Sequence, residues 1–473
     1  MILGVKRYVY KLIRQGGTFK RILKELKVSQ YYTKEEIEQY QNQNLQKMIN
    51  HCYNNVPYYM ELLKSLALKP EDIRTKKDLA KLPLLDKQTV KDNFDKLIAK
   101  NVNRLFCTTA ETSGTTGTPA KFLRDYYLVN FENALLWRFW QNAGDKGAKR
   151  VILRGDLIIP ITKNKPPFWT YYSKNELVMS SYHLNELNSR FYIKKLNEFK
   201  PEFIYAYPSS IYLLARFVSQ ANANIPLNAI FTSSETILPH QRSLIEEAFK
   251  CPIYDWYGQA ERVSAIGQCE KGAYHIMEDA SITEVIETQY GMEIVGTHLH
   301  NYIMPLIRYR TGDIVNLSDK KCDCGRHFPV VSNIQGRVVN YILTPEGNRF
   351  ALTLLCYCFD DVSDIYETQF VQHNKNELMV NIVKGQGFVE GDKDKMINSI
   401  KNHISPNLKV VINEMKEIPR GPSGKFQLLV NSINDMVKEG GKTGEYTVSR
   451  EQTDENVTTR DASQVQGGIE EAS

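Results

Sequence analysis

Between residues 150 and 260 the sequence alternates short apolar segments with longer stretches that have helical spacing. The apolar segments are rich in valine, isoleucine and aromatic residues, as buried strands are. Alternation of this kind predicts a layered α/β domain in which helices pack on a sheet. The predicted strands are 151–153, 203–206, 229–231 and 253–255, and the predicted helices are 187–199, 209–220 and 239–249.

The predicted secondary structure differs on the two sides of this region. Residues 30–66 have helical spacing that Pro57 interrupts, and residues 280–345 are rich in predicted strands, including 306–309 and 338–343. A chain of 473 residues is too long for one core, since domains average about 150 residues. We expect an N-terminal helical segment, a large N-terminal domain, a small α+β C-terminal domain and a disordered polar tail, at 1–60, 61–337, 338–437 and 438–473.

The overall composition is that of an ordinary water-soluble chain. With 42% hydrophobic and 24% charged residues, it excludes a wholly disordered chain, a fibrous repeat and a multi-span membrane protein. The net charge of +6 is weak for 473 residues and does not indicate a nucleic-acid partner. The eight cysteines come without a secretory signal, so we expect a cytoplasmic protein whose thiols are free or bind metal.

The first 27 residues are an exception to this balance, with eight basic residues and one acidic residue. Apolar residues are mixed among the charges. One interpretation is a basic amphipathic helix that rests on an anionic membrane, at its inner face. The other is a solvated helix that docks on the protein by its apolar side.

The strongest local signal is a loop rich in glycine and threonine. Its two glycines allow a tight turn and a close approach of the backbone to a ligand, and its hydroxyl groups suit the oxygens of a polyphosphate. It lacks the G-x-x-x-x-G-K-[ST] pattern, which excludes the common phosphate loop of nucleoside triphosphatases. The alternative is a surface turn. The loop consists of Thr112, Ser113, Gly114, Thr115, Thr116, Gly117, Thr118 and Pro119.

Four further motifs follow this loop in order. They are Tyr257–Glu261 (YGQAE), Arg308–Asp313 (RYRTGD), Gly336-Arg337 and Pro419–Phe426 (PRGPSGKF). The set, over roughly residues 40 to 430, resembles the adenylate-forming superfamily of acyl- and aryl-CoA ligases. Three more segments resemble its phenylacetate–CoA ligase-like branch, namely NNVPYY at 54–59, HIMED at 275–279 and CDCGR at 322–326. The segment LTPEGNR at 343–349, with Gln369 and Gln372, is similar to relatives in capsular polysaccharide biosynthesis.

This resemblance implies an ATP-dependent ligase that forms an acyl- or aryl-adenylate, releases pyrophosphate and passes the acyl group to coenzyme A or an amine. A large adenylate-forming domain would carry the site, and a small α+β lid domain would rotate between the two steps. The resemblance implies phosphate binding by Thr112–Pro119 with Lys121 nearby, adenine packing by Ser233, Ser234 and Glu235, and purine stacking by Tyr257 beside Gly258. It implies Mg²⁺ binding by Glu261, ribose binding by Asp313, and charge neutralisation by Lys425. Arg337 would face either the ribose or the phosphates.

Two departures from the superfamily pattern favour a function without catalysis. Ala260 stands where a hydroxyl residue is usual, and Val338 follows Arg337 where a charged hinge residue is usual. The alternative function is therefore a non-catalytic nucleotide-binding protein of the same fold in a membrane-associated assembly. The presence of Lys425, Glu261 and Asp313 argues for the enzyme.

Three cysteines and one histidine form a candidate structural zinc site. Cys269, His275, Cys322 and Cys324 supply the ligand types and the ligand number of a tetrahedral site. The resemblance points the same way, because some relatives in the phenylacetate-like branch carry such a site. The alternative is a set of buried cysteines beside an unrelated histidine.

Several aromatic residues suit either a pocket for the carboxylic acid or a hydrophobic core, and the sequence does not separate the two. They are Phe131, Trp137, Phe139, Trp140, Tyr205 and Tyr207.

Overall fold

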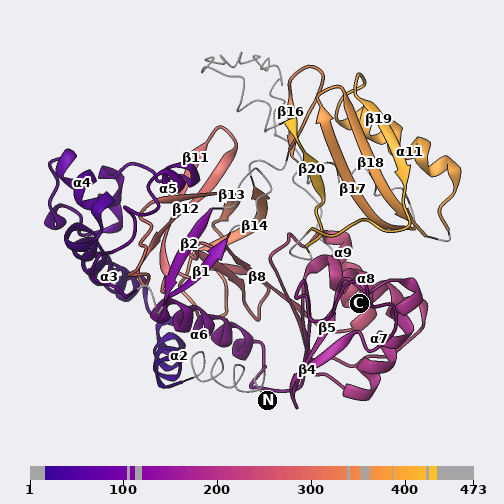
Figure 1. The fold of residues 1–473 in the computed structure, drawn as a ribbon, viewed down its shortest axis with the longest axis horizontal. Helices are drawn as coiled ribbons and strands as arrows, with labels where there is room; N and C mark the ends of the chain where they lie inside the picture. Colours follow the sequence, from indigo (N-terminus) through magenta and orange to yellow (C-terminus); the bar gives the residue numbers. More distant parts are fainter. Residues whose placement is uncertain are drawn as a thin grey trace, which may run out of the picture.

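The computed structural model describes residues 16–103, 107–111, 120–337, 341–351, 355, 359, 362, 364–385, 387–421 and 425–433 (Figure 1). The predicted phosphate loop at 112–119, the segment 338–340 and the predicted disordered tail lie outside these residues. Within them, a twelve-stranded sheet organises the large domain and a four-stranded sheet organises the C-terminal one. The predicted fold class is confirmed.

One half of the large sheet is parallel and contains the strands and helices predicted between residues 150 and 260. Alternate residues of β6 face opposite sides, with Phe203 and Tyr205 packing toward α6 and Ile204 and Ala206 toward α7 to α9. The elements are β3 (Arg150–Arg154), β5 (Glu176–Ser180), α7 (Glu186–Phe199), β6 (Phe203–Ala206), α8 (Pro208–Gln220), β7 (Ala229–Ser233), α9 (Pro239–Phe249) and β8 (Ile253–Gly258), with α6 (Tyr126–Asn142) on the other face.

The strand order in this half is β5-β3-β6-β7-β8. The chain moves from β3 to its neighbour on one side and later to β6 on the other side, so its direction of winding reverses between β3 and β6. In open α/β sheets, ligands bind at the carboxyl ends of the strands beside such a switch point.

The other strands of the large sheet are antiparallel to their neighbours. The predicted strand at 306–309 is wrong, because β13 begins only at Tyr309. Arg308 has φ +54°, and its N–H donates to Thr297 Oγ1 at 2.9 Å, so the chain turns before the strand begins. The strands are β4 (Trp169–Ser173), β9 (Ala265–Gln268), β10 (Tyr274–Ile276), β11 (Ser281–Thr288), β12 (Gly291–His298), β13 (Tyr309–Ser318) and β14 (Val330–Arg337).

N-terminal helices and a hairpin cover the antiparallel half. Thr33 and Glu36 form a capping box that starts α3, and α3 ends before Pro57, which is the first residue of α4. The elements are α2 (Gly17–Ser29), α3 (Lys34–Asn55), α4 (Pro57–Ser65), η1 (Pro70–Asp72), η2 (Lys76–Lys81), α5 (Lys87–Asp92), β1 (Cys107–Glu111) and β2 (Lys121–Asp125).

Helix α2 belongs to the basic N-terminal segment, for which the sequence left open a membrane-surface helix or a helix docked on the protein. It buries Phe19, Ile22 and Leu26 in a core shared with α6. From residue 16 onward, the apolar face therefore docks on the protein. None of the described helices has the length and apolar character that a membrane crossing requires.

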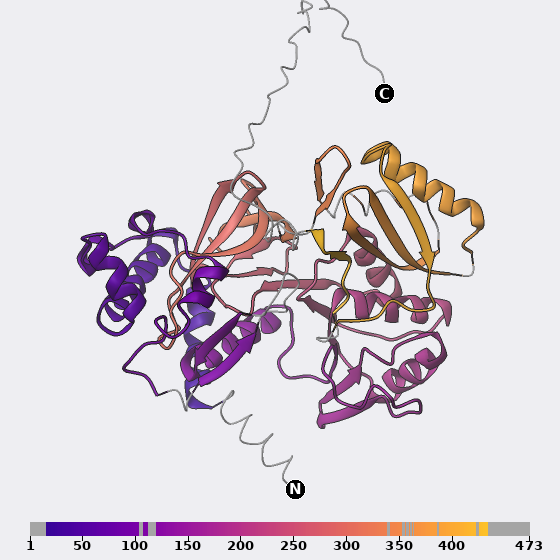
Figure 2. The same ribbon diagram turned by 45° about the horizontal axis from the view of Figure 1, so that its top comes forward.

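The C-terminal domain has its own sheet, in the order β19-β18-β17-β20, covered by α11. It lies over α8 and α9 of the large domain (Figure 1; Figure 2). The elements are β15 (Tyr341–Leu343), β16 (Arg349–Ala351), β17 (Ile365–Asn374), β18 (Glu377–Lys384), α11 (Glu390–His403), β19 (Lys409–Glu414) and β20 (Leu429–Asn431).

Candidate functional site

The carboxyl ends of β3, β6, β7 and β8 bring predicted site residues together at one edge of the sheet. Ser234 follows β7, and its Oγ accepts a hydrogen bond of 2.9 Å from Arg154 at the end of β3. The Arg154 guanidinium lies 4.9 Å from the centre of the Tyr207 ring, just after β6. Ser234 has φ +74°, a conformation that is uncommon for serine and that clusters at functional sites.

Of the six aromatic residues left ambiguous by the sequence, Tyr207 alone belongs to this edge. The other five pack in or against the core between the sheet and α6. Those five are Phe131, Trp137, Phe139, Trp140 and Tyr205.

The antiparallel half of the sheet curls back over the end of β8. Three strands, β9, β10 and β14, separate β8 from β13, yet the Tyr257 hydroxyl donates to Asp313 Oδ2 at 2.7 Å. Gln259 Nε2 donates to the same hydroxyl at 2.7 Å. Arg337 stands opposite Asp313 in the ladder between β13 and β14. The predicted purine-stacking and ribose-binding residues are therefore neighbours, and burial followed by the Asp313 charge raises the pKa of Tyr257.

Glu261 lies just beyond β8, and its side chain is buried. Its Oε1 accepts from the Tyr309 hydroxyl at 2.9 Å, while Oε2 has no protein donor in the described part of the chain. His298 Nε2–H donates to the Glu261 carbonyl at 2.8 Å, and His298 Nδ1 accepts from the Leu306 N–H at 3.1 Å. Burial lowers the pKa of His298 to about 4, so this ring is neutral and holds Glu261 in place.

The hairpin of β1 and β2 docks beside Glu261. Arg124 on β2 donates through Nε to the Ala260 carbonyl at 3.1 Å. Lys121 pairs with Glu111 across the hairpin at 3.8 Å. The predicted phosphate loop connects these two strands, and β2 contacts the residue before the predicted Mg²⁺ ligand through Arg124. Sequence reasoning missed Arg124, since a lone arginine in a strand carries no local signal.

The C-terminal domain contributes Lys425, whose Nζ lies 6.0 Å from the centre of the Tyr207 ring. The next residue, Phe426, donates its N–H to Glu235 Oε1 at 2.9 Å. Glu235 Oε2 accepts from the N–H of Ser209 at the start of α8, at 3.0 Å. The Glu235 carboxylate therefore bridges the large domain and the lysine segment, a role that the sequence did not indicate.

A second attachment holds the beginning of β17. Arg216 of α8 donates to the Ile365 carbonyl at 2.7 Å and to Asp364 Oδ1 at 3.1 Å. Its guanidinium also stacks 3.6 Å from the centre of the Tyr366 ring, and Gln220 donates to the Tyr366 hydroxyl at 2.9 Å. The two attachments fix the C-terminal domain over the carboxyl ends of the strands.

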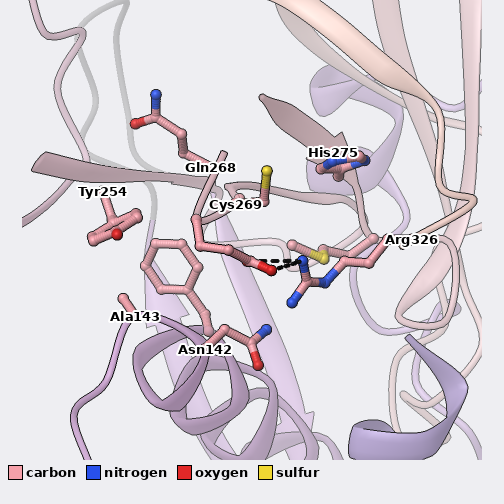
Figure 3. A pocket seen from close by; sticks show the side chains of 11 residues that line it. Asn142, Ala143, Tyr254, Gln268, Cys269, His275 and Arg326 are labelled. Carbon is pink, nitrogen blue, oxygen red and sulfur yellow. Dashed lines mark hydrogen bonds and ion pairs between the residues drawn. The ribbon is translucent and has the colours of Figure 1, made fainter. Parts of the chain in front are cut away.

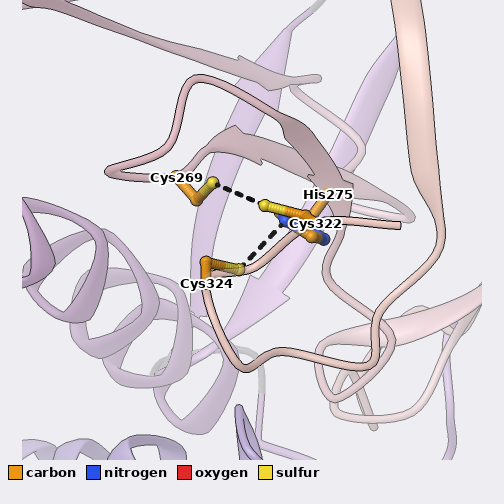
Figure 4. A group of neighbouring side chains, drawn as sticks. All are labelled: Cys269, His275, Cys322 and Cys324. Carbon is orange, nitrogen blue, oxygen red and sulfur yellow. Dashed lines mark hydrogen bonds between the residues drawn. The ribbon is translucent and has the colours of Figure 1, made fainter. Parts of the chain in front are cut away.

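The four candidate zinc ligands converge (Figure 4). One ligand atom from each lies within 4.8 Å of the others, with 3.5 Å between the sulfurs of Cys269 and Cys322 and 3.3 Å between Cys324 Sγ and His275 Nε2. Tetrahedral zinc with Zn–S bonds of about 2.3 Å separates its ligand atoms by roughly 3.8 Å, so the donor set fits the ion.

Surrounding groups orient these ligands. The Nδ1–H of His275 donates to the Phe328 carbonyl at 3.1 Å, which leaves Nε2 unprotonated toward the sulfurs. Burial opposes ionisation of the Cys324 thiol, but hydrogen bonds from the Arg326 backbone and guanidinium outweigh it and lower the pKa of that thiol. Arg326 is held in turn by Glu270 at 2.9 Å, beside a small pocket that Cys269 and His275 also line (Figure 3).

The fold belongs to a known class. It matches the crystal structure of 2-hydroxyisobutyryl-CoA ligase in complex with 2-HIB-AMP with a TM-score of 0.64, 16% identity and coverage of 84% of this chain and 91% of that one. Residues 342–432 match the family model of the CapK C-terminal domain.

Two proteins are similar to this chain in sequence over most of its length. The chain is 29% identical to Protein CapK of Staphylococcus aureus over 404 residues, which is 83% of this chain and 89% of that protein. It is 21% identical to a phenylacetate-coenzyme A ligase of Thermus thermophilus over 442 residues, 84% of this chain and 97% of that protein. The chain is thus a homologue of CapK and of the phenylacetate-coenzyme A ligases, as the motifs indicated.

Proposed function

We propose that this protein is an AMP-forming ligase that activates a carboxylic acid with ATP and transfers the acyl group to coenzyme A or an amine. The observation that supports it most is the meeting of two domains at one edge of the sheet. The large domain supplies Tyr257, Glu261 and Asp313, and the C-terminal domain supplies Lys425 over Tyr207. The relatives that are named as CoA ligases support the reaction class.

The proposed reaction begins when the substrate carboxylate attacks the α-phosphorus of ATP and pyrophosphate leaves. Both reactants are anionic, so catalysis depends on charge neutralisation and in-line positioning rather than on proton transfer. The positive charge of the Lys425 ammonium group offsets the negative charge of the two reactants. Glu261 would hold Mg²⁺, whose charge neutralises phosphate oxygens. Asp313 accepts hydrogen bonds from the ribose hydroxyls, and Tyr257 packs against the purine.

Carboxylate-dependent exchange of labelled pyrophosphate into ATP tests this proposal with a panel of aryl, fatty, hydroxy, amino and dicarboxylic acids. We expect exchange with one class of acid, and a fall of about 100-fold or more in Lys425→Ala, because a positioned charge at the reacting centre is lost. Lys416→Ala, which alters an exposed lysine of the same domain, should match the wild type. ATP binding without exchange for any acid would contradict the proposal and favour a non-catalytic nucleotide-binding protein.

The acceptor is tested separately with the preformed adenylate. Thioester formation with coenzyme A and amide formation with an amino sugar are the two outcomes. The resemblance of residues 343–349 to relatives in capsular polysaccharide biosynthesis makes a role in surface polysaccharide biosynthesis part of the proposal, and amide formation would support that role.

We further propose that Cys269, His275, Cys322 and Cys324 hold a structural zinc ion. All four positions are filled by the protein, so the ion would tie the β9–β10 turn to the segment after β13 and would not take part in the reaction.

Metal analysis of the purified protein should find about one equivalent of zinc. The double variant Cys322→Ser/Cys324→Ser should lose it and unfold at lower temperature, because structural zinc contributes directly to folding. Cys251→Ser changes a buried cysteine outside the cluster and should keep the metal. Metal-free protein with unchanged thermal stability would contradict the site.

A further inference from the structure

Arg154 is the arginine that the proposed reaction leaves unexplained. Its side-chain partners are the Ser234 hydroxyl and Tyr207, and no carboxylate of the described residues forms an ion pair with it. Seven other arginines, in the interior or between the domains, do pair with an aspartate or glutamate, and Arg124 donates to the Ala260 carbonyl. The seven are Arg138, Arg150, Arg216, Arg262, Arg308, Arg326 and Arg420.

The nearby acidic groups do not fill this role. The Glu235 carboxylate is occupied by two backbone N–H groups, from Ser209 and Phe426. Asp156 lies two residues beyond Arg154 in the chain, is exposed, and does not pair with it. A guanidinium has five N–H donors, and the hydrogen bond to Ser234 Oγ uses one of them. Its remaining donors suit bidentate binding of a carboxylate or a phosphate.

The position of Arg154 indicates which anion it meets. Two strands, β6 and β7, separate β3 from β8, a span of roughly 14 Å at the usual strand spacing. Glu261 and the hairpin of the predicted phosphate loop lie at the β8 end. Arg154 lies at the other end of this row, and both Arg154 and Lys425 lie over the ring of Tyr207. Since both cations are measured to the centre of the same ring, they are at most about 11 Å apart.

We propose that Arg154 binds a second anionic group on the acid that this enzyme activates, so that the substrate is a compact acid with two anionic groups. This inference rests on the proposed function, in which the reacting carboxylate meets Lys425. A monoanionic acid would leave the Arg154 guanidinium covered by substrate without a counterion, which is costly in a site that excludes water.

The test compares acids that differ by one charge. Succinate is paired with butyrate, and glutarate with valerate, in the pyrophosphate exchange assay. We expect kcat/KM to favour the dianionic acids by 100-fold or more in the wild type. Arg154→Gln should remove most of this preference through the KM of the acid and leave the KM of ATP unchanged. Arg190→Gln is the matched control, because Arg190 is an exposed residue of α7 whose guanidinium also covers an aromatic ring, that of Phe191.

Two outcomes of this assay would overturn the assignment. Equal kcat/KM for the two classes of acid in the wild type would show that no second anion is recognised. A rise in the KM of ATP with every acid in Arg154→Gln would assign the guanidinium to a phosphate of ATP instead.

A binding measurement separates this inference from the proposed function. With α,β-methylene-ATP present, glutarate should raise the unfolding temperature of the wild type and of Arg190→Gln but not that of Arg154→Gln. That result together with no exchange for any acid would contradict the ligase and support the anion site. Exchange with monoanionic acids alone, without stabilisation by glutarate, would contradict the anion site and support the ligase.

Discussion

Asp279→Ala is expected to lower the free energy of unfolding by about 3–5 kcal/mol, because it leaves a buried guanidinium without its carboxylate. Asp279 and Arg138 form a bidentate ion pair in which both side chains are almost fully buried. Ser29 Oγ donates to Asp279 Oδ2 at 2.6 Å, and Arg138 donates to the Leu26 carbonyl at 2.9 Å. The pair therefore joins α2, α6 and the segment after β10.

Chemical denaturation followed by tryptophan fluorescence measures the change, and thermal unfolding should shift by roughly 3–8 °C. Glu25→Ala is the matched control, because it removes an exposed ion pair, between Arg21 and Glu25, on α2, the helix that the buried pair holds in place. Its expected cost is below about 1 kcal/mol. The double variant Arg138→Met/Asp279→Leu should recover much of the loss, since apolar replacements leave no unpaired charge. Equal effects of Asp279→Ala and Glu25→Ala would contradict the prediction.

Glu235→Ala is expected to slow acid-dependent pyrophosphate exchange roughly 10- to 100-fold. A hydrogen bond to a carboxylate is worth about 1.5–3 kcal/mol, and each 1.4 kcal/mol changes an equilibrium tenfold. Without the bond from Phe426 N–H to Glu235, the segment that carries Lys425 docks over the strands less often. The expected loss is in kcat, with the KM of ATP changed less.

Limited trypsin digestion gives an independent measure of this docking. Cleavage after Lys425 should be faster in Glu235→Ala than in the wild type, because the segment is released from the large domain. Glu247→Ala, an exposed glutamate of α9, is the control for both measurements. If Glu235→Ala weakened ATP binding and left cleavage unchanged, the carboxylate would serve the nucleotide, as the motif implied, rather than the C-terminal domain.

The parallel half of the sheet was predictable because its strands are apolar on both faces. Strand β6, for example, is buried along its whole length. Strand β17 was not predicted, and two glutamines explain why. Gln369 and Gln372 are buried, and their amides hydrogen-bond to the Gln427 carbonyl and to the backbone of Leu343. Buried amides that replace apolar residues remove the hydrophobic pattern by which a strand is recognised.

The residues of the candidate site also fall into two groups, those that the sequence indicated and those that only the folded structure indicates. Candidate residues such as Glu261 and Lys425 lie in motifs and were proposed through resemblance, and the candidate zinc ligands, which converge in the fold, were proposed from their chemical type. Arg124 and Arg154 act on partners 136 and 80 residues away, and nothing in their immediate neighbours distinguishes them from surface arginines. Glu235 was found, but its bonds depend on two backbone N–H groups that only the folded chain brings together.

The hydrophobic core identified in the C-terminal domain is formed by residues between 342 and 429 and includes none from the large sheet. Its attachments at Arg216 and Glu235 are polar. Two units built in this way can diverge at different rates, because a change in the packing of one does not oblige the other to repack. Substitutions at the strand ends near Arg154 can therefore accumulate without repacking the core of the C-terminal domain.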